Sequence, residues 1–218
     1  FSSIGVIGMN EAGLNAQWLK AGLESEETKK FAVSVLNHMR EKLIGYQMEY
    51  GNLYGLEATP AESATFRFAR LDRERFSGIR TAGHEGDTPY YTNSTKLPAD
   101  YDGTLQGALI NQDSLQPLYT TGTVFHVYME RELEDWKKAR DLLSSMITEH
   151  HIPCFTLSPV YTICQTCGYL PGRQERCPKC NGAADVYSRI AGYYRPVHDW
   201  NDGKAQEFRN RIMFRIGE

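Results

Sequence analysis

Long hydrophobic runs, an excess of positive charge, and cysteines before residue 154 are all missing from this sequence. No apolar run approaches the roughly 20 residues of a membrane-spanning helix, and no signal peptide is visible, so no membrane anchor is predicted. The formal net charge of −3 leaves no basic footprint for nucleic acid or for an anionic membrane. We find no internal repeat and no low-complexity segment, which argues against a repeat architecture.

What the sequence contains is typical of a folded intracellular protein. Its 218 residues, 41% hydrophobic and 23% charged, are enough for one large domain, with or without a small appendage. Four of its five cysteines form two CxxC pairs, which in a reducing compartment indicate metal or redox chemistry instead of disulfides. We therefore expect a cytoplasmic protein. Because Phe1 lies inside an apolar, strand-like stretch, we expect a piece of a longer or processed chain.

The order of the predicted elements favours an α/β fold with crossover units. Apolar periodicity and end signals predict helices over residues 24–50, 59–76, 103–115 and 132–149. Alternating β-branched and aromatic residues predict strands over residues 53–57, 118–129, 154–163 and 185–191. Between them, residues 77–104 are rich in Gly, Asp, Thr and Pro and are expected to form a long loop of the functional or mobile kind.

Two helix starts are predicted from capping residues. Ser25 is the expected N-cap of the helix over 24–50, which Gly51 would end. The stretch TPAE predicts a capping box, with Thr59 as the cap, Pro60 at the first helical position and Glu62 returning the hydrogen bond. This structural role explains Glu62 without any catalytic one.

The most specific motif consists of two CxxC pairs, formed by Cys164, Cys167, Cys177 and Cys180. Each pair is short enough for both thiolates to reach one ion, and the polar stretch GYLPGRQER between the pairs contains turn residues. Four soft thiolates favour a closed, structural Zn²⁺ ribbon, which positions the chain and activates no water. An iron–sulfur cluster and a redox dithiol pair stay open as alternatives. Cys154, between Pro153 and Phe155, is expected to be an inert core thiol.

A second motif surrounds Gly192, which follows Cys180 by 12 residues in the stretch SRIAGYYRPV, residues 188–197. Two interpretations apply to this glycine. It can serve a tight turn, because glycine reaches positive φ at no steric cost. It can also be needed for its bare Cα–H bonds.

The stretch resembles the radical-bearing loop of glycyl radical enzymes, an Arg–apolar–small–Gly–Tyr pattern. The whole chain is similar to the C-terminal part of the anaerobic (class III) ribonucleoside-triphosphate reductases. Besides the two CxxC pairs, the resemblance rests on GMNEAG (8–13), LEATPAES (56–63), YYTNSTKLP (90–98), PLYTTGTVFHVY (117–128) and RIAGYYRPVHDWNDGKAQEF (189–208). Other glycyl radical enzymes share the loop but generally lack a ribbon directly before it.

The resemblance implies the fold and its division. We expect an α/β fold, namely the C-terminal portion of a ten-stranded glycyl-radical-type α/β barrel with a small four-cysteine zinc ribbon near the C-terminus. Residues 1–160 would belong to the barrel, residues 161–184 to the ribbon, and residues 185–218 to the glycyl radical loop and a C-terminal helix.

The resemblance also implies the reaction, the anaerobic reduction of ribonucleoside triphosphates to deoxyribonucleotides for DNA replication. A radical-SAM activating enzyme would install a radical on Gly192, whose Cα must flatten and therefore tolerates no Cβ. The radical would pass to a cysteine, whose thiyl takes hydrogen from C3′ before the 2′-hydroxyl leaves as water. Formate or a thiol reductant would supply the electrons.

No cysteine of this chain fits the thiyl role. We expect that cysteine upstream of Phe1, together with the ATP/dNTP effector site, so this chain alone would be inactive. The partners implied are the N-terminal part of the enzyme, the activating enzyme, the nucleotide substrate, and a second copy in a homodimer.

Several polar residues in the shared motifs could face the substrate: Glu57, Asn93, Ser94 and Thr120. Local turn hydrogen bonds are an equal alternative for Asn93 and Ser94. Arg189 and Arg195 are expected to form ion pairs that lock the ends of the glycine loop, with Tyr193 and Tyr194 packed around it.

Three rival functions remain: a non-enzymatic zinc-ribbon binding module, another glycyl radical enzyme, and a radical-bearing spare-part subunit. A module for nucleic acid would cluster cations and exposed aromatics around the CxxC pairs. The ribbon loop offers only Arg173, Arg176 and Lys179. The long match upstream of the loop argues against a spare part.

Overall fold

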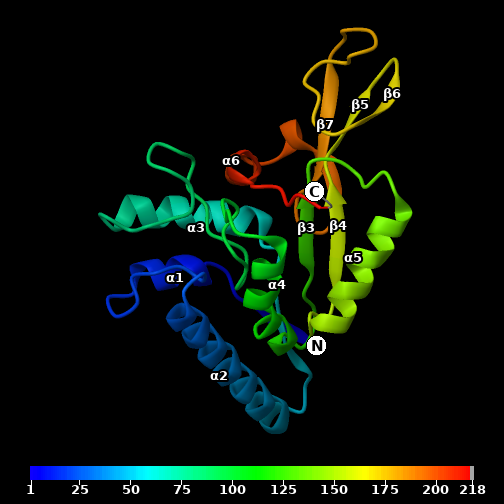
Figure 1. The fold of residues 1–218 in the computed structure, drawn as a ribbon. Helices are drawn as coiled ribbons and strands as arrows, with labels where there is room; N and C mark the ends of the chain where they lie inside the picture. The colour runs from blue at the N-terminus through cyan, green and yellow to red at the C-terminus, as the bar shows by residue number, and fades with distance from the viewer. Residues whose placement is uncertain (217–218) are drawn as a thin grey trace.

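The computed structural model describes residues 1–216, in which helices and short strands alternate (Figure 1). The helices are α1 (Met9–Asn15), α2 (Glu26–Tyr50), α3 (Glu62–Arg75), α4 (Leu105–Asp113), α5 (Trp136–Glu149) and α6 (Asp202–Asn210), with 3₁₀ turns η1 (Gln116–Leu118) and η2 (Val197–Asp199). The strands are β1 (Ser2–Gly5), β2 (Tyr54–Glu57), β3 (Phe125–Met129), β4 (Phe155–Pro159), β5 (Tyr161–Cys164), β6 (Gly168–Pro171), β7 (Ala184–Arg189) and β8 (Tyr194–Pro196).

Two parallel strand pairs confirm the mixed α/β prediction. β1 pairs with β2 after the chain passes through α1 and α2, and β3 pairs with β4 after α5. Parallel strands need such crossovers because a tight turn joins only antiparallel strands, and the chain must return to the start of the sheet before it can run in the same direction again. The described residues form three separate sheets and close no barrel among themselves.

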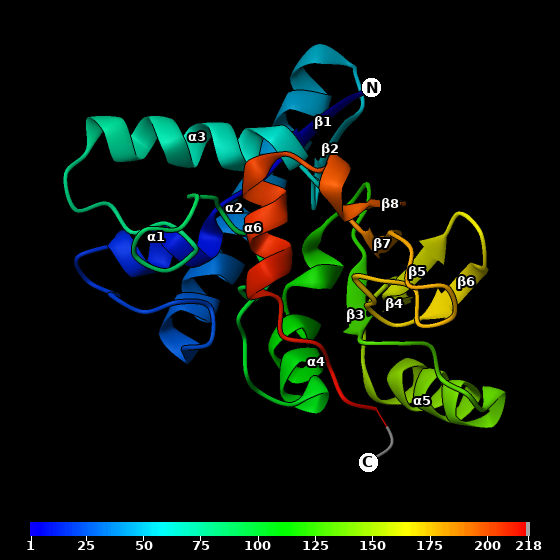
Figure 2. The ribbon, with the colours of Figure 1, turned by 90° about the horizontal axis from the view of Figure 1, so that it is seen from above.

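The third sheet is antiparallel, in the order β6-β5-β7-β8, and its β5–β6–β7 end extends away from the helices (Figure 1). Strand β7 continues through the turn 190–193 into β8, and within this turn the Ile190 N–H donates to the Tyr193 carbonyl at 3.0 Å. The sheet therefore joins the cysteine motif, at the end of β5, to the glycine motif, at the end of β7. Helix α6 lies between α3 and the β3–β7 side of the molecule (Figure 2).

Helix α2 confirms its predicted ends. The Ser25 hydroxyl accepts a hydrogen bond from the Thr28 N–H, and Gly51 ends the helix with a left-handed φ of 66°. Its apolar stripe of Ala32, Leu36 and Leu43 is buried against β2 and η1.

The capping box predicted at the start of α3 is wrong. The helix begins at Glu62, and its N-cap is Ala61, which has a φ of 38° and makes no side-chain cap hydrogen bond. The Thr59 side chain packs against Gly5 of β1, where an added Cβ would lie 2.4 Å from its methyl group. Packing between β1 and this segment thus overrides the local capping preference.

Strand β3 is shorter than the predicted strand over 118–129 because the preceding residues bond to a different strand. The Thr120 N–H donates to the Leu56 carbonyl, and the Ala58 N–H donates to the Gly122 carbonyl, each at 2.8 Å. This segment therefore follows the edge of β2, and β3 begins only at Phe125.

Cys154 is exposed, contrary to the prediction of a core thiol. It precedes the first residue of β4, and its carbonyl accepts the Phe125 N–H at 2.8 Å while its side chain faces outward. None of the helices formed by residues 1–216 combines the length and apolar character needed to span a bilayer.

Substituting Gly13→Ala should destabilise the fold by about 1–3 kcal/mol, because overpacking forces neighbours apart. An added Cβ would lie 2.4 Å from both the Ala21 carbonyl oxygen and the Thr28 methyl group. The Ala21 carbonyl oxygen also accepts a 2.8 Å hydrogen bond from the Thr28 hydroxyl, so neither residue moves easily. Urea denaturation measures the change.

The control is Gly45→Ala at an exposed position in the C-terminal part of α2, where an added Cβ meets no atom within 4 Å. Alanine there should stabilise the helix by about 0.5–1 kcal/mol. Equal stabilities for the two variants would contradict the close packing of α1.

Candidate functional site

The four paired cysteines converge at one end of the antiparallel sheet. The Sγ atoms of Cys164, Cys167, Cys177 and Cys180 all lie within 4.8 Å of one another. The Cys164 and Cys180 sulfurs are 3.6 Å apart, close to the roughly 3.8 Å expected for two thiolates bound tetrahedrally at about 2.3 Å from one zinc ion. The left-handed residues Gly168 and Asn181 turn the chain after each pair. This cluster could hold a metal ion, as the spacing predicts.

Hydrogen bonds from neighbouring backbone groups lower the pKa of the Cys177 thiol. Burial raises its pKa, but hydrogen bonds from the backbone of Cys180 and Lys179 outweigh this effect and lower the pKa to about 7. Because the thiolate is the ligand form of cysteine, a lowered pKa favours metal binding at neutral pH.

Gly192 lies at the exposed tip of the β7–β8 hairpin. Its φ is not left-handed, and a Cβ added there would meet no heavy atom within 4 Å. The interpretation that a turn with positive φ needs this glycine is therefore wrong. Neither conformation nor packing among the described residues requires glycine at this position.

Arg189 contacts Gly192 directly. Its Nη1 donates to the Gly192 carbonyl at 2.8 Å, and its Nε donates to the Ser158 hydroxyl at 3.0 Å. The guanidinium also lies 4.8 Å from the ring centroid of Tyr194. The predicted ion pair of Arg189 is therefore replaced by a hydrogen bond to the glycine itself.

The other loop residues behave closer to prediction. Arg195 forms the expected ion pair, with Asp199 at 3.9 Å. The Tyr194 hydroxyl donates to the Pro159 carbonyl at 3.0 Å and so ties the loop to β4. Tyr193 is half exposed, and its hydroxyl lies 3.5 Å from a carboxylate oxygen of Glu62.

A cavity of about 310 Å³ opens beside Gly192. Its walls come from the end of β2, the loop 90–101, β3, the hairpin tip and α6 with the residues that follow it. The polar side chains that line it include Glu57, Asn93, Lys96, His126, Glu207 and Arg211. Four of the stretches recognised separately in the sequence therefore meet at this cavity, namely residues 56–63, 90–98, 117–128 and 189–208.

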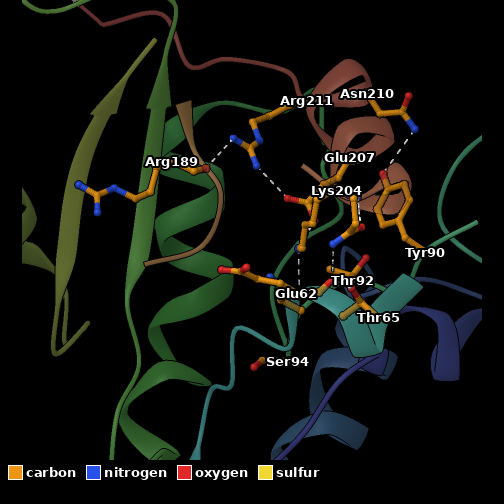
Figure 3. Close-up of polar contacts among 12 residues, drawn as sticks. Glu62, Thr65, Tyr90, Thr92, Ser94, Arg189, Lys204, Glu207, Asn210 and Arg211 are labelled. Carbon is orange, nitrogen blue, oxygen red and sulfur yellow. Dashed lines mark hydrogen bonds and ion pairs between the residues drawn. The ribbon is translucent and has the colours of Figure 1, made fainter. Parts of the chain in front are cut away.

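Glu207 and Arg211 line the cavity and belong to a buried ion cluster that Lys204 completes (Figure 3). The Glu207 carboxylate lies 2.5 Å from Lys204 Nζ and 2.8 Å from Arg211 Nη2. Burial raises the pKa of Glu207, but these two cations outweigh it and hold that pKa below its usual range. The Arg211 Nη1 also donates to the Arg189 carbonyl at 3.2 Å, which connects the cluster to the hairpin.

Several cations act on Lys96 and His126 in the cavity. Burial and the nearby charge of Lys204 lower the pKa of Lys96 to about 8. Burial, together with Lys96, Arg189 and other cations, lowers the pKa of His126 to about 2, so its imidazole is neutral at physiological pH. The His126 Nδ1 lies 2.9 Å from the Thr156 hydroxyl of the neighbouring strand.

The four residues expected to face the substrate divide into two pairs. Glu57 and Asn93 line the cavity, where Glu57 accepts a hydrogen bond from Ser3 at 2.9 Å and Asn93 accepts one from Lys204 at 3.2 Å. Ser94 is fully buried with a left-handed φ of 51°, and the Thr120 hydroxyl accepts the Leu56 N–H at 2.8 Å. The last two side chains do not line this cavity.

A family model described as anaerobic ribonucleoside-triphosphate reductase matches residues 1–214. The chain belongs to this reductase family. The anaerobic ribonucleoside-triphosphate reductase of Haemophilus influenzae is 25% identical over 222 residues, covering 96% of this chain and 31% of that protein. The one from Enterobacteria phage T4 is 25% identical over 194 residues, covering 82% of this chain and 30% of that protein.

Solved structures of anaerobic ribonucleotide reductases share this fold. One superposes with a TM-score of 0.78 at 22% identity, covering 97% of this chain and 34% of that chain. The Thermotoga maritima enzyme in complex with dATP and CTP gives a TM-score of 0.73 at 23% identity, covering 94% of this chain and 33% of that chain. This reductase-family chain therefore spans about a third of the length of these relatives.

Sequence reasoning missed the ion cluster and His126 of this reductase-family chain. Lys204, Glu207 and Arg211 follow one another at i, i+3 and i+7, which places them on one helix face as a chain of opposite charges. That spacing was a readable signal. His126 had no such signal, because a single histidine in a strand forms no spaced motif with other residues of the sequence.

The neutral, half-buried His126 should make the stability of the fold decrease as the pH falls. In the unfolded chain its pKa is near 6.5, and in the folded chain it is about 2, so the unfolded state binds more protons between these values. The contribution is complete above about pH 6.5 and is lost at up to about 1.4 kcal/mol per pH unit below it. His126→Gln should therefore flatten the loss of stability between pH 7 and pH 5, measured by urea denaturation. His38→Gln, on the exposed face of α2, is the control, and equal slopes for the two variants would refute the assignment.

Proposed function

We propose that this chain is the part of an anaerobic ribonucleotide reductase that carries the glycyl radical, on Gly192, and a structural zinc ion, on its four paired cysteines. The observation that supports this most is the glycine at the exposed hairpin tip beside the cavity. Neither its φ nor the packing around it within residues 1–216 requires glycine. The lack of a Cβ on its Cα is therefore the property that explains why glycine is at this position.

A backbone radical explains that property. After one Cα–H bond is broken, the unpaired electron is shared with the amide nitrogen and the carbonyl, which requires a flat Cα. A Cβ would crowd this centre. The exposed tip would give a separate radical-SAM activating enzyme access to the Cα hydrogen.

In turnover, the stored radical would pass to a cysteine in the longer protein's remaining part. The thiyl would take hydrogen from C3′ of a ribonucleoside triphosphate, the 2′-hydroxyl would leave as water, and formate or a thiol reductant would supply two electrons. The ten-stranded barrel would be completed by the same remaining part, with β1–β2 and β3–β4 contributing strands. We keep the division of this chain into barrel (1–160), ribbon (161–184) and radical loop with C-terminal helix (185–218).

The cavity supports the placement of the nucleotide. Glu57 and Asn93 supply a carboxylate and an amide, the groups that bind ribose hydroxyls, and Lys96 and Arg211 supply positive charge. The Thermotoga maritima relative is described with dATP in a specificity site. We place the corresponding effector site in the part of the enzyme outside this chain, and we expect the enzyme to form a homodimer.

The zinc ion would have a positioning role. Four thiolates leave no open coordination position, so the ion would fix the end of β5 and the loops around it. Strand β5 pairs with β7, and β7 ends at Arg189 beside the glycine turn. A metal ion that fixes the end of β5 would therefore also restrict the position of Gly192 through strand β7.

One equivalent of zinc per chain is expected, and its removal should loosen the hairpin. Cys177→Ser or chelation should abolish stoichiometric zinc by elemental analysis and increase protease cleavage near residues 190–193. Cys154→Ser, which changes the exposed cysteine outside the cluster, should alter neither. Iron in place of zinc, or an unchanged cleavage pattern after zinc loss, would refute this role.

The radical itself is tested by electron paramagnetic resonance. The complete enzyme, activated anaerobically by its radical-SAM partner, should give a carbon-centred doublet that Gly192→Ala abolishes, and air should then cut the wild-type chain at Gly192. The variant should fold normally, because its Cβ meets no atom within 4 Å. Gly45→Ala, on the outer part of α2, should keep the doublet. No signal from wild type with a working activating enzyme and a filled metal site would contradict the proposal.

A further inference from the structure

We propose that Arg189 is a positioning residue for the radical. Its charged hydrogen bond to the Gly192 carbonyl oxygen draws negative charge onto that oxygen and thereby moves unpaired spin from the Cα onto the amide nitrogen. The inference rests on the proposed role of Gly192 as the radical carrier. It gives a functional role to the Arg189 guanidinium, which forms no ion pair within residues 1–216.

The contact has the geometry of a charge-assisted hydrogen bond. Arg189 Nη1 lies 2.8 Å from the Gly192 carbonyl oxygen, within the range typical of such bonds. Both residues belong to the same hairpin end, which the bond between Ile190 and Tyr193 closes. The donor is therefore in place before any radical forms.

The guanidinium keeps its full charge for this contact. Among the described residues 1–216, no carboxylate lies within ion-pair distance of Arg189. Its remaining partners are the neutral Ser158 hydroxyl at 3.0 Å and the Tyr194 ring at 4.8 Å. An unneutralised cation exerts the strongest pull on the carbonyl it touches.

Both ends of Arg189 are fixed by neighbouring elements. Ser158 is fully buried and continues through the Thr156 hydroxyl, at 3.0 Å, to His126. On the backbone side, the Arg189 carbonyl accepts a hydrogen bond from Arg211 Nη1 at 3.2 Å, and the buried Glu207 holds Arg211. A donor fixed in this way needs little reorganisation when charge or spin shifts on the carbonyl.

The chemistry of the radical gives the contact its effect. On activation, one Cα–H bond of Gly192 breaks homolytically, and the hydrogen atom goes to the carbon-centred radical supplied by the activating enzyme. No proton moves, and Arg189 stays a cation throughout. A cation at the carbonyl favours the resonance form with negative charge on the carbonyl oxygen and the unpaired electron on the amide nitrogen, so spin density at Cα falls and the stored radical lasts longer.

The test compares Arg189→Met and Arg189→Lys in the complete, activated enzyme. Arg189→Met should widen the hyperfine splitting from the remaining Cα hydrogen and shorten the radical's half-life roughly tenfold, within the range that loss of one charged hydrogen bond allows. Arg189→Lys should lie between Arg189→Met and wild type. Arg195→Met is the matched control, because Arg195 is in the same loop but pairs with Asp199, and it should leave both readouts unchanged.

A second measurement needs no radical. In the inactive enzyme with a ¹³C carbonyl at Gly192, Arg189→Met should raise the isotope-edited amide I frequency, and Arg195→Met should not. An unchanged band, or a shifted band with unchanged splitting and half-life, overturns the proposal.

If the variant accumulates no radical, the 5′-deoxyadenosine released shows which step failed. Its release with no lasting radical supports the proposal, and its absence overturns it. A wild-type enzyme with no doublet would instead refute the proposed function.

Discussion

The Glu207 carboxylate, held between Lys204 and Arg211, is the interaction on which the arrangement of the site depends. Through these two cations it connects α6 to Asn93 in the long loop, to the ring of Tyr128 on β3, 3.8 Å from the Arg211 guanidinium, and to the backbone of Arg189. Leaving a buried ion of such a cluster without its partner costs about 3–5 kcal/mol. The cluster therefore fixes three elements around the cavity at once.

The cysteine cluster and the glycine act on the same sheet from opposite ends. Cys164 ends β5, and Arg189 ends the β7 strand that pairs with it. A metal ion bound at one end would constrain the hairpin together with the charged hydrogen bond at the other end. The proposed metal site would in this way help to position a glycine whose own geometry is not constrained by φ or by packing.

The places where sequence reasoning failed share one physical cause. Thr59 had the right chemistry to cap α3, and Cys154 had the right neighbours for a buried strand, yet packing against Gly5 and the late start of β4 gave both a different environment. Local preference is worth about 1 kcal/mol for a cap, and contacts between distant segments easily exceed it. The segment before Phe125 follows the same rule, because bonds to Leu56 and Ala58 draw it to β2.

The sequence by itself determined the mixed α/β class, the ends of α2, the four cysteines that cluster and could hold a metal ion, and the glycine motif, because each depends on residue type at short, fixed spacing. Only the tertiary structure decided that Gly192 has no conformational need to be glycine, that Arg189 binds its carbonyl instead of a carboxylate, and that His126 and the ion cluster share its cavity. These facts depend on the path of the backbone and on which distant segments meet, as His126 of β3 meets the hairpin tip. Spacing along the chain carries no information about such contacts.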